Sequence, residues 1–256
     1  MNTVYIGIDL TADQRPHNVA GLDDELRLVL QSTGKFDEVV AAVTAYASAS
    51  VAIDAPQSPN AGLMADPARR AQLGLPPNGR TWANCKVCEY ELRHHGIGLY
   101  FTPRTVEAAP VWMQTGFRLY AALRAEGFEL WRPGIESPRT LLEVHPHASF
   151  TVLLGHRPLR KDTLEGRLQR QLVLFEEGLD VPDPMNVVDE ITRQHMRVGL
   201  QNLPGLLSHD ELDALVAAYT AFIAAREPGR LTAIGDPDEG QIVLPIAPAE
   251  FKASYR

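Results

Sequence analysis

The chain has 256 residues, of which 45% are hydrophobic and 22% are charged, and its formal net charge is −8. This composition is typical of a globular protein with one full core, and the negative charge argues against a protein that coats nucleic acid nonspecifically. The chain has no apolar run long enough to cross a bilayer and no basic segment before its first apolar stretch, so we expect neither a membrane span nor a signal peptide. Two cysteines give no disulfide framework, and we expect a cytoplasmic protein.

The N-terminal part of the chain predicts a mixed α/β arrangement. Apolar alternation and turn residues predict, in order, a strand at residues 4–9, a polar turn at 11–17, a strand at 26–30 that could pair with the first, a helix at 36–46 and a strand at 51–54. Pro56 cannot continue the last strand. Strands, then a helix, then a strand are typical of an α/β fold.

Both of the strands at residues 4–9 and 51–54 end in an aspartate, Asp9 and Asp54. If the strands are parallel neighbours, both carboxylates lie at the same carboxyl edge, where open α/β sheets place their sites. Two carboxylates a few Å apart repel each other unless a proton or a cation lies between them. A divalent metal is the simplest such cation, whereas the alternative is that each aspartate only caps a following turn.

Residues 56–110 interrupt this pattern with prolines and glycines, and we expect a long irregular connection with one helix near residues 85–95. Connections of this length are usually functional or mobile. Cys85 and Cys88, followed by His94 and His95, could bind zinc, but a structural zinc site needs four ligands at a different spacing. The alternative is that both cysteines are small buried side chains.

The middle of the chain predicts a helix at residues 113–125, a third strand at 140–145 and a helical insertion at 147–200. That insertion contains a basic stretch at residues 156–170, which either binds phosphates or forms a solvated helical face. His145 and His147 follow Glu143 at the end of the third strand, where they could act as general bases or be held by the backbone.

The last helix begins near Ser208, because Ser208 and Glu211 have the spacing of a capping box. Asp210 and Asp213 are three residues apart and therefore share a face of this helix. The helix dipole accounts for Asp210 in the first turn but less well for Asp213. Small residues beside Asp213 permit close packing on a sheet. A hairpin at residues 234–245 follows.

Several segments together resemble the DUF429 family, a group predicted to be nucleases with an RNase H-like fold. The segments are GIDLT at residues 7–11, VAIDAPQSPN at 51–60, LLEVHPHA at 141–148, KDTLEGRLQR at 161–170, DELDALVAAYTA at 210–221 and IGDPDEGQIVLP at 234–245. The resemblance implies one RNase H-like domain over residues 1–256, a mixed sheet flanked by helices with insertions at about 56–110 and 147–200. In such a sheet the first and fourth strands lie side by side.

The resemblance also implies a set of site residues. Asp9 and Asp54 match the first-strand and fourth-strand acids of RNase H-like enzymes, and Asp210 and Asp213 resemble paired acids on the last helix of the Holliday-junction-resolvase branch. These four would bind Mg²⁺ or Mn²⁺, and Glu143 is a further catalytic candidate with Asp9, Asp54 and Asp213. Hard divalent ions prefer such oxygen ligands. The candidates for substrate binding are Arg93, Arg104, His145, Lys161 and Arg167.

The sequence therefore predicts hydrolysis of a phosphodiester by a two-metal carboxylate site, with a nucleic acid or a nucleotide as the substrate. One alternative is an inactive RNase H-like scaffold that binds nucleic acid or a partner without cleavage. Another is an enzyme that transfers a phosphoryl group of a nucleotide, although actin-like and sugar-kinase folds need two copies of the core. The oligomeric state does not follow from the sequence.

Overall fold

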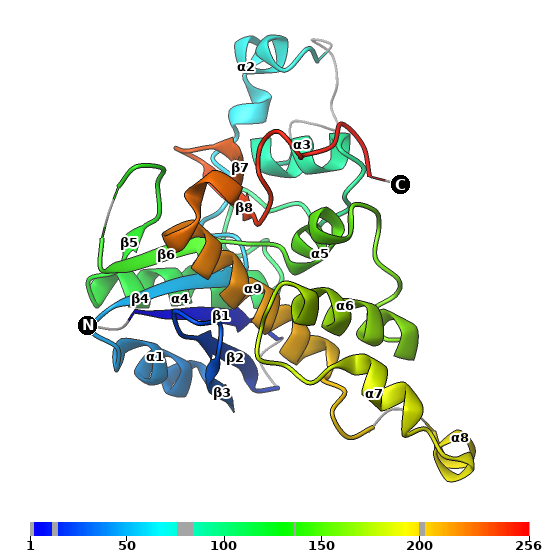
Figure 1. The fold of residues 1–256 in the computed structure, drawn as a ribbon. Coiled ribbons are helices and arrows are strands. Elements are labelled where there is room, and N and C mark those ends of the chain that lie inside the picture. Colours follow the sequence, from blue (N-terminus) through cyan, green and yellow to red (C-terminus); the bar gives the residue numbers. More distant parts are fainter. Residues whose placement is uncertain (1–2, 12–14, 76–83, 136, 200–202, 256) are drawn as a thin grey trace.

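A computed structural model describes residues 3–11, 15–75, 84–135, 137–199 and 203–255 (Figure 1). The strands are β1 (Val4–Asp9), β2 (His17–Leu22), β3 (Leu28–Gly34), β4 (Ala49–Asp54), β5 (Glu129–Leu130), β6 (Arg139–Glu143), β7 (Thr232–Asp236) and β8 (Gly240–Leu244). The helices are α1 (Phe36–Thr44), α2 (Pro67–Gln72), α3 (Val87–His94), α4 (Val111–Ala125), α5 (Pro146–Leu154), α6 (Leu164–Glu176), α7 (Pro184–Asp189), α8 (Arg193–Val198) and α9 (His209–Arg226). Short 3-10 turns lie at Leu63–Ala65 and Pro228–Arg230. No helix within these ranges is long and apolar enough to span a bilayer.

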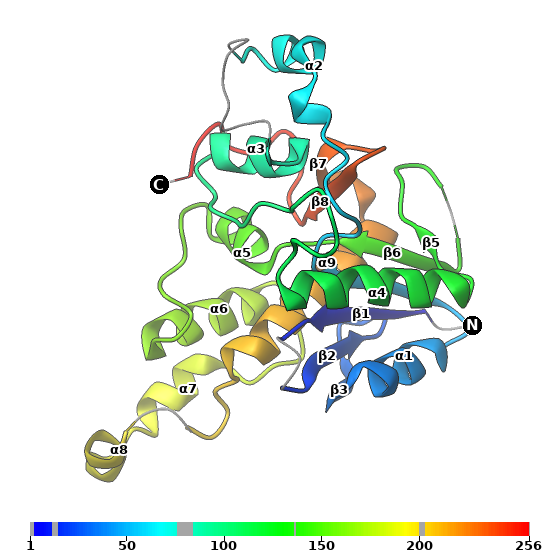
Figure 2. The same ribbon diagram turned by 180° about the vertical axis from the view of Figure 1, so that it is seen from behind.

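A mixed sheet lies at the centre of the molecule, with the strand order β3-β2-β1-β4-β6-β8-β7 and with β5 also paired to β6. The central strands β1, β4 and β6 are parallel, whereas β2, β3 and β7 are antiparallel to their neighbours. One face of the sheet packs on α9, with α5 and α6 beside α9, and the other face packs on α1 and α4 (Figures 1 and 2). The predicted mixed α/β fold is therefore confirmed.

The close contact between α9 and β1 depends on Gly7. A Cβ atom at this position would lie 1.9 Å from the carbonyl oxygen of Ala214 and 2.3 Å from the backbone nitrogen of Ala218. Only glycine, which has no Cβ atom, fits so close to a helix backbone. Because Asp213 precedes Ala214, this contact holds Asp213 beside the end of β1.

Most of the predicted elements are confirmed, namely the strands that end at Asp9 and Asp54, the helix that ends before Gly127, the helical segment after Pro146 and the C-terminal hairpin. The pairing predicted for residues 26–30 is wrong. β3 pairs with β2, and β2 is the antiparallel neighbour of β1. Residues 17–22 are all buried, so they lack the apolar–polar alternation that reveals a half-exposed strand.

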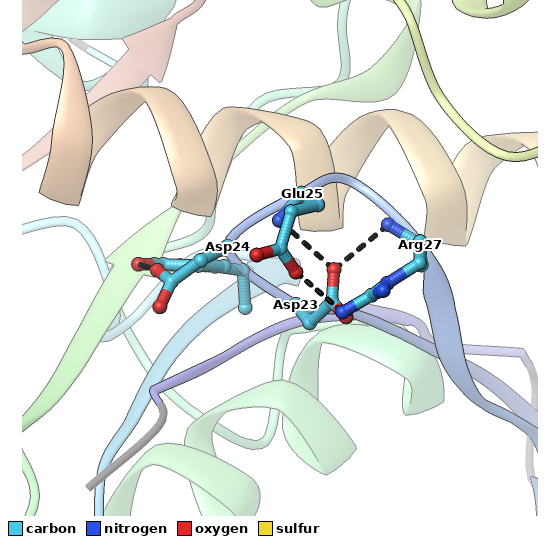
Figure 3. Close-up of polar contacts among 5 residues, drawn as sticks. Asp23, Asp24, Glu25 and Arg27 are labelled. Carbon is cyan, nitrogen blue, oxygen red and sulfur yellow. Dashed lines mark hydrogen bonds and ion pairs between the residues drawn. The ribbon is translucent and has the colours of Figure 1, made fainter.

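The turn between β2 and β3 gathers three carboxylates, and we call residues 23–27 the acidic turn (Figure 3). The Asp23 carboxylate accepts hydrogen bonds from the backbone N–H groups of Glu25 (3.0 Å) and Arg27 (2.9 Å) and from Arg27 Nε (2.8 Å). Arg27 also pairs with Glu25, and Asp24 accepts a hydrogen bond from the Tyr5 hydroxyl (2.7 Å). Each acid of the turn thus has a donor.

Candidate active site at the carboxyl edge of the sheet

Asp9 and Asp54 lie side by side at the carboxyl edge of the sheet. β1 and β4 are parallel neighbours, and their register makes Asp9 and Asp54 cross-strand partners. The Asp9 residue is only 6% exposed, whereas Asp54 is half-buried. The adjacency that the two strand endings predicted is therefore confirmed.

Helix α9 brings two further acids to this edge. Its first turn is fixed by the predicted capping box, in which the Glu211 N–H donates to Ser208 Oγ (3.2 Å) and the Ser208 N–H donates to Glu211 Oε2 (2.8 Å). Asp213 follows one turn into the helix and is 3% exposed. Asp210 pairs with His209 at 3.2 Å.

These four acids line one pocket of about 690 Å³, which we call the acidic pocket. The pocket is also lined by cationic and imidazole side chains, namely Arg15, Arg160, Lys161, Arg170, His145, His147 and His209. Its volume lies within the range of small-ligand sites.

Asp9 has an unusual electrostatic environment. Burial, followed by the negative charges of Asp54, Asp213 and Asp210, raises the pKa of Asp9 to about 9. Among the described residues no donor forms a hydrogen bond with the Asp9 carboxylate. Without a cation beside it, Asp9 therefore holds a proton at neutral pH.

Lys161 contacts one of these four acids directly. Its Nζ donates to Asp213 Oδ2 at 2.7 Å, and half of its side chain is exposed. Burial opposes the ammonium charge, but the charges of Asp213, Asp9 and Asp54 outweigh it and raise the pKa of Lys161. Burial raises the pKa of Asp213, and Lys161 opposes that rise. The predicted phosphate contact of Lys161 stays a prediction, since here the lysine binds an acid.

His145 and His147 both line the acidic pocket, but their environments differ. His145 Nδ1 lies 3.8 Å from Asp54 Oδ1, and its Nε2 donates to the carbonyl of Gly98 (3.3 Å). Burial disfavours the charged form of His145, yet the nearby carboxylate of Asp54 outweighs burial and raises the pKa of His145. Burial and the neighbouring His145 lower the pKa of His147 to about 4. Of these two histidines, His147 is therefore neutral at neutral pH, whereas the environment of His145 favours its protonated form.

Glu143 lies outside the lining of the acidic pocket. Its Oε2 accepts a hydrogen bond from the Gln57 N–H (3.0 Å), and it borders a separate cavity of about 40 Å³ that also touches Asp54 and His145. Burial raises the pKa of Glu143, while Lys86 and the Gln57 N–H oppose that rise. The structure therefore places Glu143 behind Asp54, where it holds the chain that follows β4.

The three arginines that the sequence analysis proposed for substrate binding do not line the acidic pocket. Arg93 donates to the Leu99 carbonyl (2.6 Å) and lies over the ring of Phe101, Arg104 lies against Gly62, and Arg167 is on α6. A role for them in binding substrate stays a prediction, with no support from the pocket's lining.

Arg15, which the sequence did not single out, lines the pocket instead. Arg160 and Arg170 also do so, but Arg160 pairs with Asp162 (2.7 Å), and Arg170 donates to the Leu159 and Gly166 carbonyls (2.8 Å each). Arg15 forms no ion pair with any residue in the described ranges. The sequence could have indicated Arg15 by its position, since it lies six residues after Asp9, in the polar turn that leads into β2.

Cys85 and Cys88 are both buried, and neither is part of a disulfide. Burial raises the pKa of Cys85 to about 12 and that of Cys88 well above its usual range, so both are protonated at neutral pH. Over the part of the chain that the structure describes, no three His, Cys, Asp or Glu side chains form a ready-made metal site. This holds for the cysteine region and for the acidic pocket alike.

A family model described as "Protein of unknown function (DUF429)" matches residues 7–239. No curated protein and no solved structure gave a significant match. The family match covers the end of β1 and all of β4, β6 and α9, the four elements that carry Asp9, Asp54, Glu143 and the α9 acids. The chain therefore belongs to the DUF429 family.

Proposed function

We propose that this protein hydrolyses phosphodiester bonds of a nucleic acid or nucleotide with the help of Mg²⁺ or Mn²⁺. The observation that carries the proposal is the pair Asp9 and Asp54, cross-strand partners at the edge of a pocket that Asp210 and Asp213 also line. Parallel strands β1 and β4 side by side, with β2 and β3 antiparallel beyond β1, support the RNase H-like topology that the sequence predicted.

The acids fit a divalent ion by their chemistry. All four offer carboxylate oxygens, which are the donors that Mg²⁺ and Mn²⁺ prefer. The raised pKa of Asp9 indicates negative charge that the described residues do not balance, and a bound cation would replace the proton there. Asp9, Asp54 and Asp213 would hold the ion, with Asp213 released from Lys161. Such an ion would supply an activated water and would neutralise charge on the phosphate.

The cationic side chains of the pocket would orient the substrate. Arg15, which has no acidic partner in the described ranges, would bind a phosphate oxygen. Lys161 would turn from Asp213 to the substrate when a metal takes its place. His145 would add a third positive group, because Asp54 favours its imidazolium form.

A cleavage assay tests the proposal. Wild-type protein with Mn²⁺ is incubated with RNA, single-stranded DNA, an RNA–DNA hybrid, branched DNA and the small diester bis(p-nitrophenyl) phosphate. We expect activity that EDTA removes. The cleavage activity of Asp54→Asn should fall by more than the roughly 10- to 100-fold that removal of an outer-shell partner costs. Asp23→Asn in the acidic turn should retain the wild-type cleavage activity. Equal activity of Asp54→Asn and wild type would refute the assignment.

A further inference from the structure

The acidic pocket also has an aromatic part that a metal and a phosphate do not use. Tyr100 and Trp112 line it together with Leu99 and Leu159. A site that only held ions and a phosphate would need polar groups, so these side chains indicate that the ligand has an apolar, flat portion.

Tyr100 and Trp112 form an anchored aromatic pair. Their ring centroids lie 6.1 Å apart with an interplanar angle of 63°. Trp112, in the first turn of α4, is half-buried and packs on the core below the sheet. Tyr100 is 76% exposed. A large aromatic ring fixed beside a rigid neighbour and open to solvent is a suitable surface for stacking.

The size and charge of the pocket restrict the ligand further. A volume of about 690 Å³ suits a ligand of the size of one or two nucleotides. The formal net charge of −8 disfavours a long phosphate track along the surface. In a duplex both faces of each base are already stacked, so only an unpaired base can place a face on Tyr100.

We propose that this site takes an unpaired nucleotide, whose base stacks on Tyr100 and Trp112 while its phosphate lies at Asp9 and Asp54. The inference rests on the proposed function and names the substrate class of the same pocket: a single-stranded segment of DNA or RNA. The stacking pair selects single strands, and the carboxylates act on the adjacent phosphodiester.

Fluorescence anisotropy with Mn²⁺ tests this inference. The probes are fluorescein-labelled, phosphorothioate-linked pentanucleotides of DNA and of RNA, the same backbone with abasic sites, and a duplex of the DNA sequence. We expect the single strands to bind more tightly than the abasic and duplex probes, and the DNA and RNA probes distinguish the two sources of an unpaired base. Tyr100→Ala should weaken single-strand binding by roughly 5- to 100-fold, and Tyr100→Phe should retain it.

Two controls separate stacking from a general defect. Tyr100→Ala should leave the weak affinity for the abasic probe unchanged. Trp131→Leu alters a half-buried tryptophan that follows β5 and lies outside the lining of the acidic pocket, and it should bind like wild type. The inference is overturned if Tyr100→Ala binds single strands like wild type, if the duplex or abasic probe binds as tightly as the single strand, or if no probe binds. Hydrolysis of bis(p-nitrophenyl) phosphate, which has no base, then judges the proposed function separately.

Discussion

The acidic turn and the acidic pocket both gather several carboxylates, but only the turn supplies each acid with a strong donor. Backbone N–H groups and Arg27 donate hydrogen bonds to Asp23 (Figure 3). Slight burial raises the pKa of Asp23, but these hydrogen bonds outweigh burial and lower it. At the sheet edge, burial and like charges raise the pKa of Asp9 to about 9. Acids that stabilise a fold are partnered, whereas buried acids that oppose one another are typical of functional sites.

The largest expected effect is on the pH dependence of stability in metal-free protein. Folded Asp9 keeps its proton up to about pH 9, whereas an unfolded aspartate loses it near pH 4. Between these values the folded state binds more protons, so the free energy of unfolding falls as pH rises, by up to about 1.4 kcal/mol per pH unit. Asp9→Asn should remove this slope in urea unfolding with EDTA between pH 5 and 9.

The matched control is Asp23→Asn in the acidic turn. The folded pKa of Asp23 is lowered, so its contribution to stability is present above the unfolded pKa and is lost only as pH falls through the folded value. Asp23→Asn should therefore leave the slope between pH 5 and 9 as it is in wild type. If Asp9→Asn and wild type gave parallel curves in this range, Asp9 would not be an uncompensated acid.

A second, smaller effect is expected at Lys161, which balances part of the pocket's charge through Asp213. Lys161→Met should tighten Mn²⁺ binding by about 5-fold, since a half-exposed ion pair is worth about 1 kcal/mol. It should also reduce turnover, because the lysine no longer reaches the phosphate. Arg160→Met, which alters the neighbouring exposed pair with Asp162 and not a contact with the four acids, should leave Mn²⁺ affinity unchanged. Weaker Mn²⁺ binding in Lys161→Met would mean that the lysine does not compete with a metal.

A third effect on the pocket is expected at Glu143, which lies behind Asp54 and accepts a hydrogen bond from the Gln57 N–H. Glu143→Gln keeps an acceptor for this hydrogen bond, so Mn²⁺ affinity should fall by no more than about 10-fold, the lower bound of what loss of an outer-shell partner costs. Calorimetric Mn²⁺ titration measures it. A loss as complete as that in Asp54→Asn would instead make Glu143 a direct ligand.

The sequence predicted the central part of the site because its signals were local. Asp9 and Asp54 end apolar runs, and the Ser208–Glu211 capping box fixes where α9 begins. These features depend on a few neighbouring residues, so chain pattern alone locates them. The sheet edge then follows from the rule that sites lie at the carboxyl ends of parallel strands.

The remaining features depend on tertiary packing, which one sequence does not show. Lys161, in the loop between α5 and α6, contacts Asp213, which lies 52 positions further along the chain. The sequence alone does not distinguish Arg15 from Arg93. The packing of the surrounding elements places Arg15 at the pocket, whereas Arg93 donates to the Leu99 carbonyl. β2 was missed for the same reason, since burial on both faces removes its alternation.

Mn²⁺ binding measured by isothermal titration calorimetry tests the central claim most directly, with wild type, Asp9→Asn, Asp54→Asn and Asp23→Asn compared at one pH. A shared metal site at the sheet edge predicts specific binding in wild type, the same binding in Asp23→Asn, and loss of binding in both strand-end variants. Binding that survives in Asp9→Asn and Asp54→Asn, or that is absent from wild type at millimolar Mn²⁺ even with a phosphorothioate pentanucleotide present, would contradict it.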